Sequence, residues 1–325
     1  GDYMKWYVVC LLVLSIILIL YYLIAMVVFK KTFGRSNLQD KDINLWLEKI
    51  KNETFREEIK NNINRLEHIS KEEVMISSYD NLRLQGYLCI NKSIKNENNN
   101  KIIIFCHGFH SSYKFDFSLS GVDFYEKGYN LLFIDQRAHQ KSEGKYTTFG
   151  IKERLDLKNW IDYINMRFSF TKTIILCGIS MGASTVMYTL GLDLPTNVSA
   201  ALCDCGYTVP YDELKYMASK KAKGLGKLLL PMVILIFITK NGESLKSMNT
   251  LNSLKNNKVP ILIIHGENDK IVPSSMGRLN YQYANKNGTL LTIPNAGHGT
   301  SYLYDKDKYV QTVDEFLEKT SKDKL

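Results

Sequence analysis

The chain has 325 residues, of which 45% are apolar, which is enough to bury the core of one large domain and excludes a disordered protein. Its formal net charge of +9 comes from Lys and Arg residues spread along the whole chain, without the basic runs or aromatic-interleaved patches of a nucleic-acid-binding protein. The six cysteines form neither a disulfide framework nor a set with zinc-ligand spacing, so we expect no metal ion.

An apolar run near the N-terminus predicts a membrane anchor. Residues 6–29 are uncharged, and this run of about 24 residues is longer than the roughly 20 that a helix needs to cross a bilayer. Lys30 and Lys31 follow directly, whereas a cleaved signal peptide has a shorter apolar core and an Ala-x-Ala-like site. Positive charges are more numerous after the run than before it, which favours a cytoplasmic domain without settling the side. We expect residues 1–31 to be a single-pass anchor.

A helical linker and then an alternation of strands and helices follow the anchor. Residues 32–71 are charged, with apolar side chains at spacings of three and four, which predicts helices that link the anchor to the domain. From residue 72 to residue 325 short aliphatic runs alternate with helical patterns, as in a mostly parallel sheet covered by helices on both faces. The sequence thus predicts an α/β domain with eight strands, at residues 74–78, 84–90, 102–106, 130–134, 173–177, 200–203, 260–264 and 290–293.

One stretch of the domain, at about residues 206–254, breaks this alternation. It contains an apolar run at residues 228–238, which is too short to cross a bilayer and is interrupted by Pro231. The run could form a core helix, an interfacial segment or a cap over an active site. Its position between two sheet strands favours the cap insertion, because such insertions lodge there.

The pentapeptide Gly178-Ile179-Ser180-Met181-Gly182 matches the pattern Gly-x-Ser-x-Gly. The pattern alone is common, but here it lies between a predicted strand and a helical pattern, which makes it informative. Such a turn holds the Ser in a strained backbone conformation with its Oγ exposed, and flanking glycines avoid clashes. The following helix points its N-terminal N–H groups to the place where an oxyanion develops. Ser180 is therefore the candidate nucleophile.

Two later residues are candidates for the base and the acid of a triad. This architecture uses the order Ser, then Asp or Glu, then His. Of the six histidines only His298 follows the last predicted strands, in a Gly-flanked loop. Asp269 follows the strand at 260–264, at a carboxyl end where the sites of open α/β sheets form. Glu267 is the competing acid, and an exposed loop histidine is the alternative reading of His298.

The loop after the strand at 102–106 is expected to complete an oxyanion hole. It reads His107-Gly108-Phe109 and occupies the position from which this architecture supplies a backbone donor. We expect the N–H groups of Phe109 and Met181 to face the oxyanion. His107 precedes Ser180 in the chain, so we expect it to shape the loop and not to act as the base.

Taken together, these motifs resemble the α/β-hydrolase superfamily over about residues 72–318. The stretch at 135–144 is similar to its Asp-x-Arg-x-His-Gly-x-Ser-x-Gly signature, with Gln140 where the family usually has Gly, which puts the local turn in doubt. The segments that carry the resemblance are 178–182, 107–108, 266–273 and 297–299, and Gly150, Glu153 and Asp156 follow the spacing of the bacterial, membrane-bound esterase-like branch.

The resemblance implies a serine hydrolase that cleaves carboxylic esters, of short to medium acyl or lipid-like type. It implies an acyl-enzyme formed by a Ser180, His298 and Asp269 triad, without cofactor or metal. A thioesterase, an acyltransferase and a peptidase share this fold, although the linker is too short for the propeller domain of oligopeptidases. The alternative from another class is a catalytically silent, membrane-anchored binding protein, against which the presence of all three triad residue types argues.

Overall fold

An eight-stranded sheet forms the centre of the molecule. The computed structural model describes residues 2–92, 100–168, 173–221 and 225–322. The strand order is β1-β2-β4-β3-β5-β6-β7-β8, in which β2 is antiparallel to both of its neighbours and the remaining pairs are parallel. This confirms the predicted mostly parallel α/β sheet of eight strands. The strands are β1 (Glu72–Ser77), β2 (Arg83–Cys89), β3 (Lys101–Cys106), β4 (Asn130–Ile134), β5 (Thr173–Ile179), β6 (Val198–Asp204), β7 (Ile261–Gly266) and β8 (Gly288–Ile293).

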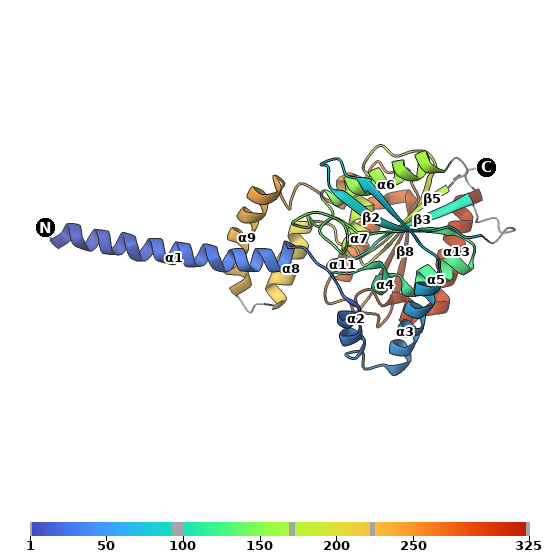
Figure 1. Cartoon of the computed structure of the whole chain (residues 1–325), viewed down its shortest axis with the longest axis horizontal. Coiled ribbons are helices and arrows are strands. Elements are labelled where there is room, and N and C mark those ends of the chain that lie inside the picture. Colours follow the sequence, from blue (N-terminus) through green and yellow to red (C-terminus); the bar gives the residue numbers. More distant parts are fainter. Residues whose placement is uncertain (1, 93–99, 169–172, 222–224, 323–325) are drawn as a thin grey trace.

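Helices cover both faces of the sheet (Figure 1). Helices α6, α7, α10 and α11 bury one face, and α3, α5 and α13 bury the other. Every residue of β4, β6 and β7 is buried, which explains why these strands appear in the sequence as continuous aliphatic runs without alternation. The bounds of the covering helices are α3 (Glu53–His68), α5 (Ser118–Glu126), α6 (Glu153–Arg167), α7 (Met181–Thr189), α10 (Thr250–Leu254), α11 (Ser274–Ala284) and α13 (Lys306–Lys322); the short elements are α4 (Tyr113–Asp116), η2 (Asn285–Asn287) and α12 (Ser301–Tyr304).

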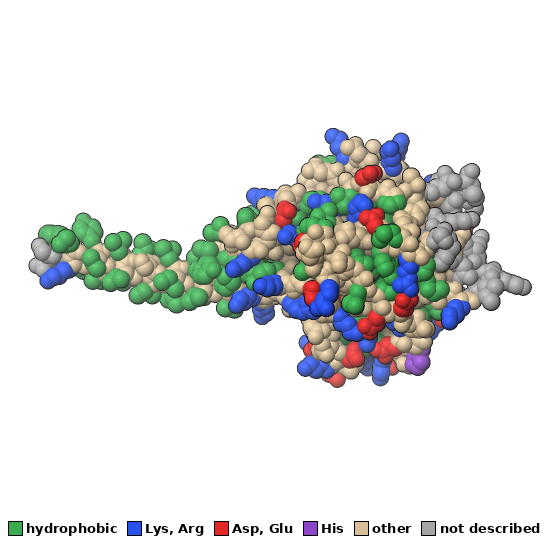
Figure 2. Space-filling view, turned by 45° about the horizontal axis from the view of Figure 1, so that its top comes forward, with side chains coloured by type: hydrophobic (Ala, Val, Ile, Leu, Met, Phe, Trp, Pro, Cys, Tyr) green, Lys and Arg blue, Asp and Glu red, His purple; other side chains and the backbone are tan. Residues whose placement is uncertain are grey.

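Helix α1 (Asp2–Phe33) projects from the domain. Figure 2 shows hydrophobic side chains along it, and Lys and Arg side chains where it meets the domain. In the described part of the chain, Tyr3–Phe33 is the one stretch of helix long and apolar enough to cross a membrane. Ala25, Phe29 and Phe33 near its end are fully buried, so the last turns of α1 are part of the packed structure.

The insertion between β6 and β7 packs against these last turns of α1. It carries α8 (Pro210–Lys221), α9 (Leu225–Asn241) and α10. Figure 1 shows α9 beside α1, where the ring centroids of Phe33 and Phe237 are 4.8 Å apart. Tyr21 of α1 also donates a hydrogen bond to the carbonyl of Leu228, at 2.7 Å. The apolar run of the insertion is therefore the surface that covers α1.

Two helices, α2 (Asp40–Leu47) and α3, occupy the linker between α1 and the sheet. The backbone N–H of Gln39 donates to the carboxylate of Asp42 at 2.9 Å, which fixes the start of α2. Asn52 caps α3 by accepting a hydrogen bond from the N–H of Phe55. Both helices lie against the domain near the carboxyl ends of the parallel strands, where the candidate site is found.

Candidate active site

Ser180 lies at a sharp turn between β5 and α7. Its backbone has φ 55° and ψ −117°, a region that residues other than glycine rarely adopt. A Cβ atom on Gly182 would lie 1.8 Å from the carbonyl oxygen of Cys106, and one on Gly178 would lie 2.4 Å from the backbone of Gly182. Both glycines are therefore required by close packing of the turn, and together they hold the Ser180 side chain at the tip.

The structure brings Ser180, His298 and Asp269 together in one hydrogen-bonded row. Ser180 Oγ lies 2.9 Å from His298 Nε2, and His298 Nδ1 lies 2.7 Å from Asp269 Oδ2. With Nδ1 donating to the carboxylate, Nε2 is left to accept the hydroxyl proton of Ser180. The three residues follow β5, β8 and β7, so three strand ends supply them at one edge of the sheet.

The carboxylate of Asp269 is held in the charged form. Its Oδ1 accepts hydrogen bonds from the N–H groups of Ile271 and Val272, at 2.8 and 2.9 Å. Burial by itself would raise the pKa of Asp269, but the hydrogen bonds from His265, His298 and the backbone outweigh it and lower this pKa to about 2. A permanent negative charge therefore lies behind His298.

The competing acid is placed elsewhere. Glu267 pairs with Arg278 at 3.3 Å on the surface, and its side chain is 39% exposed.

A buried thiol, that of Cys205, lies 4.0 Å from His298 Nε2, so it joins Asp269 and His298 in one group of potential metal ligands. Burial raises the pKa of Cys205 well above its ordinary value, which keeps the thiol protonated and makes it a poor metal ligand.

The loop after β3 runs beside the nucleophile. A Cβ atom on Gly108 would lie 3.3 Å from Ser180 Cβ, so the backbone that carries Phe109 is in direct contact with the turn. Met181 is the first residue of α7, where backbone N–H groups have no partner within the helix. Within the described residues, no hydrogen bond is found from the N–H of either Phe109 or Met181 to another part of the protein. The backbone of Phe109 and that of Met181 are thus both next to Ser180 in the structure.

Two side chains, the buried His107 and the partly buried Asp116, hold this loop in place. His107 donates from Nδ1 to the carbonyl of Gly108 at 2.8 Å and accepts at Nε2 from the N–H of Gln136 at 3.1 Å; burial lowers its pKa to about 4, so it is neutral. Asp116 accepts from the N–H of Gly108 at 2.6 Å and from the hydroxyl of Ser111 at 2.7 Å. Burial raises the pKa of Asp116 to about 6. Sequence reasoning missed Asp116, because no motif marks it.

A cavity of about 280 Å³ opens beside Ser180 and His298. One wall comes from the loop after β3 and from α4 and α5. The linker supplies another part of the wall, with Leu38, Ile43 and Trp46 of the α2 region and Ile59 of α3. The apolar residues on the domain side of the cavity are Phe109, Phe115, Leu119, Ile179 and Leu303.

The insertion packs beside the site without lining this cavity. None of the described residues of 206–254 lines it, and α9 packs against Phe29 and Phe33 of α1 in a cluster that also contains Met181 and Phe109. An apolar run predicts burial but does not identify the surface that buries it, and here α1 supplies apolar side chains at the domain end. The linker, which we expected only to connect, lies over the site.

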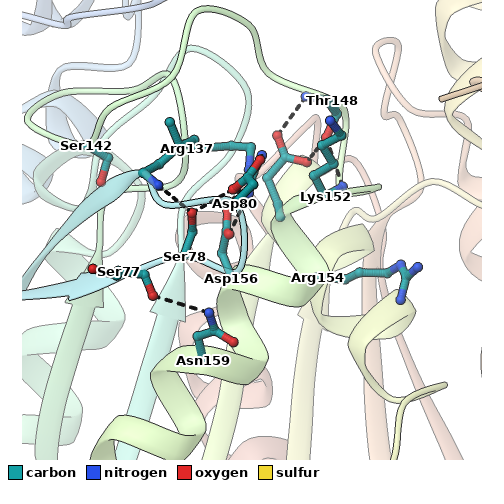
Figure 3. Close-up of polar contacts among 12 residues, drawn as sticks. Ser77, Ser78, Asp80, Arg137, Ser142, Thr148, Lys152, Arg154, Asp156 and Asn159 are labelled. Atoms are coloured by element: carbon teal, nitrogen blue, oxygen red, sulfur yellow. Dashed lines mark hydrogen bonds and ion pairs between the residues drawn. The ribbon is translucent and has the colours of Figure 1, made fainter. Parts of the chain in front are cut away.

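The motif at 135–144 stabilises the fold behind the site. The buried guanidinium of Arg137 donates to Asp156 at 2.6 and 2.7 Å and to Asp80 at 2.9 and 3.1 Å (Figure 3). Glu153, at the start of α6, accepts two backbone N–H groups of the preceding turn at 2.7 and 2.9 Å. These contacts tie the β1–β2 turn, the loop after β4 and the first turn of α6 together.

With this geometry in hand, comparison with known proteins places the chain in a family. A model of the prolyl oligopeptidase family matches residues 116–324, well over half of the chain. The chain belongs to the prolyl oligopeptidase family. The family match and the solved structures below together identify the α/β-hydrolase fold and a hydrolase.

Three similar proteins place this member of the prolyl oligopeptidase family among its relatives. The uncharacterized protein YqkD of Bacillus subtilis is 26% identical over 216 residues, which cover 66% of this chain and 70% of the relative. The Pyrococcus furiosus esterase Pf2001 is 26% identical with a TM-score of 0.62, covering 77% of this chain and 93% of that one. The Pyrococcus horikoshii acylaminoacyl peptidase has a TM-score of 0.57 at 18% identity, covering 79% of this chain and 43% of that one, and shares the fold.

Proposed function

We propose that this chain is a membrane-anchored serine hydrolase that cleaves carboxylic esters through Ser180, His298 and Asp269. The observation that carries the proposal is the row of hydrogen bonds from Ser180 Oγ through His298 to Asp269, at 2.9 and 2.7 Å, at the strained turn after β5. A surface serine has neither a base at hydrogen-bonding distance nor backbone donors on both sides. These are the features that activate a nucleophilic hydroxyl.

Each residue has a defined role in the proposed reaction. His298 Nε2 takes the proton of Ser180 as Oγ bonds to the ester carbonyl carbon, and Asp269 stabilises the resulting imidazolium. The N–H groups of Phe109 and Met181 face the tetrahedral oxyanion. His298 then returns the proton to the departing alcohol, which leaves an acyl group on Ser180. Water attacks this acyl-enzyme by the same sequence of proton transfers and releases the acid.

The cavity and the comparisons support an ester over a peptide as the substrate. The cavity beside Ser180 is small and mostly apolar, near the lower end of the usual range for small-ligand sites, which suits a short to medium acyl chain. The likeness to the Pyrococcus furiosus esterase covers 93% of that chain, whereas the likeness to the acylaminoacyl peptidase covers 43% of that one. A thioester would be attacked by the same groups.

A substrate panel tests this assignment. Full-length protein in detergent is assayed with p-nitrophenyl esters from acetate to dodecanoate, with acyl-CoA thioesters and with N-acyl peptide p-nitroanilides. We expect turnover of esters, with a maximum at short to medium chain length, that is lost in Ser180→Ala. Faster turnover of the thioesters or anilides would reassign the substrate class. Absence of any turnover by a folded protein would favour the silent binding protein.

We also infer that α1 stays attached as the membrane anchor. Phe29 and Phe33 are fully buried in a cluster with Phe237, so removal of α1 would leave the apolar face of α9 uncovered. A cleaved signal peptide makes no such contacts with the mature protein. The expected result is that the protein resists extraction from membranes by alkaline carbonate and keeps the mass of the uncleaved chain. Release of a shorter, soluble form would contradict the anchor.

A further inference from the structure

The residues that follow α1 are bound to the domain like an added strand. Gly34 and Ser36 form β-bridges with Tyr146 and His139. The N–H of Ser36 donates to the carbonyl of Ala138 at 2.8 Å, and its carbonyl accepts from the N–H of Gln140 at 2.9 Å. The guanidinium of Arg35 donates to two further carbonyls in the same loop, those of Gln140 and Ser142. The linker is thus fixed at its start.

Gln140 extends this attachment towards the active site. Its backbone has φ 45°, at the position where the α/β-hydrolase signature usually has Gly. At this positive φ, a residue with a side chain is less stable than Gly by about 1 kcal/mol. In one orientation of its amide, Gln140 Nε2 donates to the carbonyl of Ser111 at 3.4 Å. In the exchanged orientation, which satisfies both ends of the amide, the nitrogen donates to Asn37 Oδ1 at 3.0 Å and to the carbonyl of Leu38 at 3.2 Å, and the oxygen accepts from the N–H of Leu38 at 3.1 Å. Glycine offers none of these bonds.

The residues held by Gln140 lead directly into the cavity. Leu38 lines it, followed by Ile43 and Trp46 on the inner face of α2. The Trp46 ring stands edge-on to Phe115 of α4, with ring centroids 4.1 Å apart, so α2 and α4 are in contact at this part of the cavity wall. The neighbouring Leu45 is 53% exposed and does not line the cavity, whereas Trp46 is 37% exposed and does line it. One face of this short helix therefore closes the space in which an acyl chain would extend from Ser180.

We propose that the linker forms the acyl-binding wall of the active site, that Ile43 and Trp46 set the accepted chain length, and that Gln140 is the positioning residue that holds this wall. The inference rests on the proposed ester hydrolase function and adds the specificity element to it. It assigns to the segment after the anchor the role that an insertion between strands was expected to have. The membrane anchor and the substrate wall are then parts of one continuous segment.

The test compares full-length variants in detergent by the ratio of kcat/KM for the octanoyl ester to that for the butyryl ester. The ratio cancels losses common to both substrates, such as partial unfolding. Trp46→Ala removes the indole ring from the cavity wall and should raise the ratio on the order of tenfold, since a single methylene in an apolar pocket is worth about 10–200-fold. Leu45→Ala, on the outer face of the same helix, is the matched control and should leave the ratio unchanged.

Gln140→Gly suits the positive φ and removes only the amide contacts. We expect it to shift the ratio in the same direction by about threefold and to raise KM more than it lowers kcat, because the wall is loosened while the catalytic groups stay in place. A wild-type protein without ester turnover would refute the proposed function itself. If the wild type is active, the proposal that the linker forms the acyl-binding wall is overturned by either of two results. One is an unchanged ratio in Trp46→Ala, and the other is an equal effect of Trp46→Ala and Leu45→Ala on the ratio. Equal scaling of both substrates in Gln140→Gly would overturn its positioning role.

Discussion

The contact between α9 and α1 can be tested with one pair of substitutions in α9. Phe237 is fully buried, with its ring centroid 4.8 Å from that of Phe33, whereas Leu235 on the same helix is 53% exposed. Truncation of a buried Phe to Ala removes its burial and leaves a cavity, which typically costs about 3–5 kcal/mol. A chain of 325 residues, with an unfolding entropy of about 2.1 cal/mol/K per residue, changes its Tm by roughly 1.5 °C per kcal/mol. Phe237→Ala should therefore lower the Tm by roughly 4–8 °C.

The assay is thermal unfolding of the full-length protein in detergent, followed by intrinsic fluorescence. Leu235→Ala is the control and should move the Tm by no more than about 1 °C, because an exposed side chain contributes within about 0.5 kcal/mol. The octanoyl-to-butyryl ratio should not change in either variant. Equal Tm values for the two variants would refute the packing of α9 on α1. A changed ratio at constant Tm would restore the cap interpretation of this segment.

Three further predictions concern charged groups. Asp269→Asn should lower kcat by about 10⁴-fold while Glu267→Gln changes it less than about twofold, because only Asp269 contacts His298; equal losses in steady-state assays would reassign the acid. The pKa of Asp269 falls from 3.8 to about 2 on folding, so the folded state binds fewer protons between these pH values and stability is lost as pH falls from about 4 to about 2. Acid titration of the free energy of unfolding should show a loss of about 2 kcal/mol over this range that is absent in Asp269→Asn. Arg137→Met should cost about 3–5 kcal/mol in urea unfolding by leaving Asp156 buried and unpaired, and the loss for Arg83→Met, at an exposed pair, should be far smaller. Similar losses in the two variants would show that Arg137 is not part of a buried structural ion pair.

The sheet could be predicted from the sequence because its physics is local. Strands buried on both faces appear as aliphatic runs, and the structure has a strand at each of the eight expected places. The turn at Ser180 was marked by its glycines, of which Gly178 has no room for a Cβ atom because of Gly182 in the same turn. His298 and Asp269 followed from chain order and from their place after strand ends. These features need only short segments of sequence.

The remaining features depend on contacts between distant segments. The apolar run of α9 indicated burial, but only the structure shows that α1 covers it. Trp46 lies 134 positions before Ser180, and no pattern in the linker indicated that it lines the cavity. Gln140 was recognised in the sequence as a departure from the family pattern, but only the structure shows that its side chain lies against the linker. Asp116 carries no sequence signal at all.

Labelling with a fluorophosphonate probe tests the central claim most directly, because the probe reacts with a serine that has both a neighbouring base and oxyanion donors. Full-length protein in detergent is treated with the probe and mapped by mass spectrometry, and the many other serines of the chain are internal controls. The adduct is expected on the peptide that contains Ser180, and His298→Ala should slow its formation at least about 100-fold. An unlabelled Ser180, or labelling that does not depend on His298, would contradict the hydrolase assignment and favour a silent binding protein.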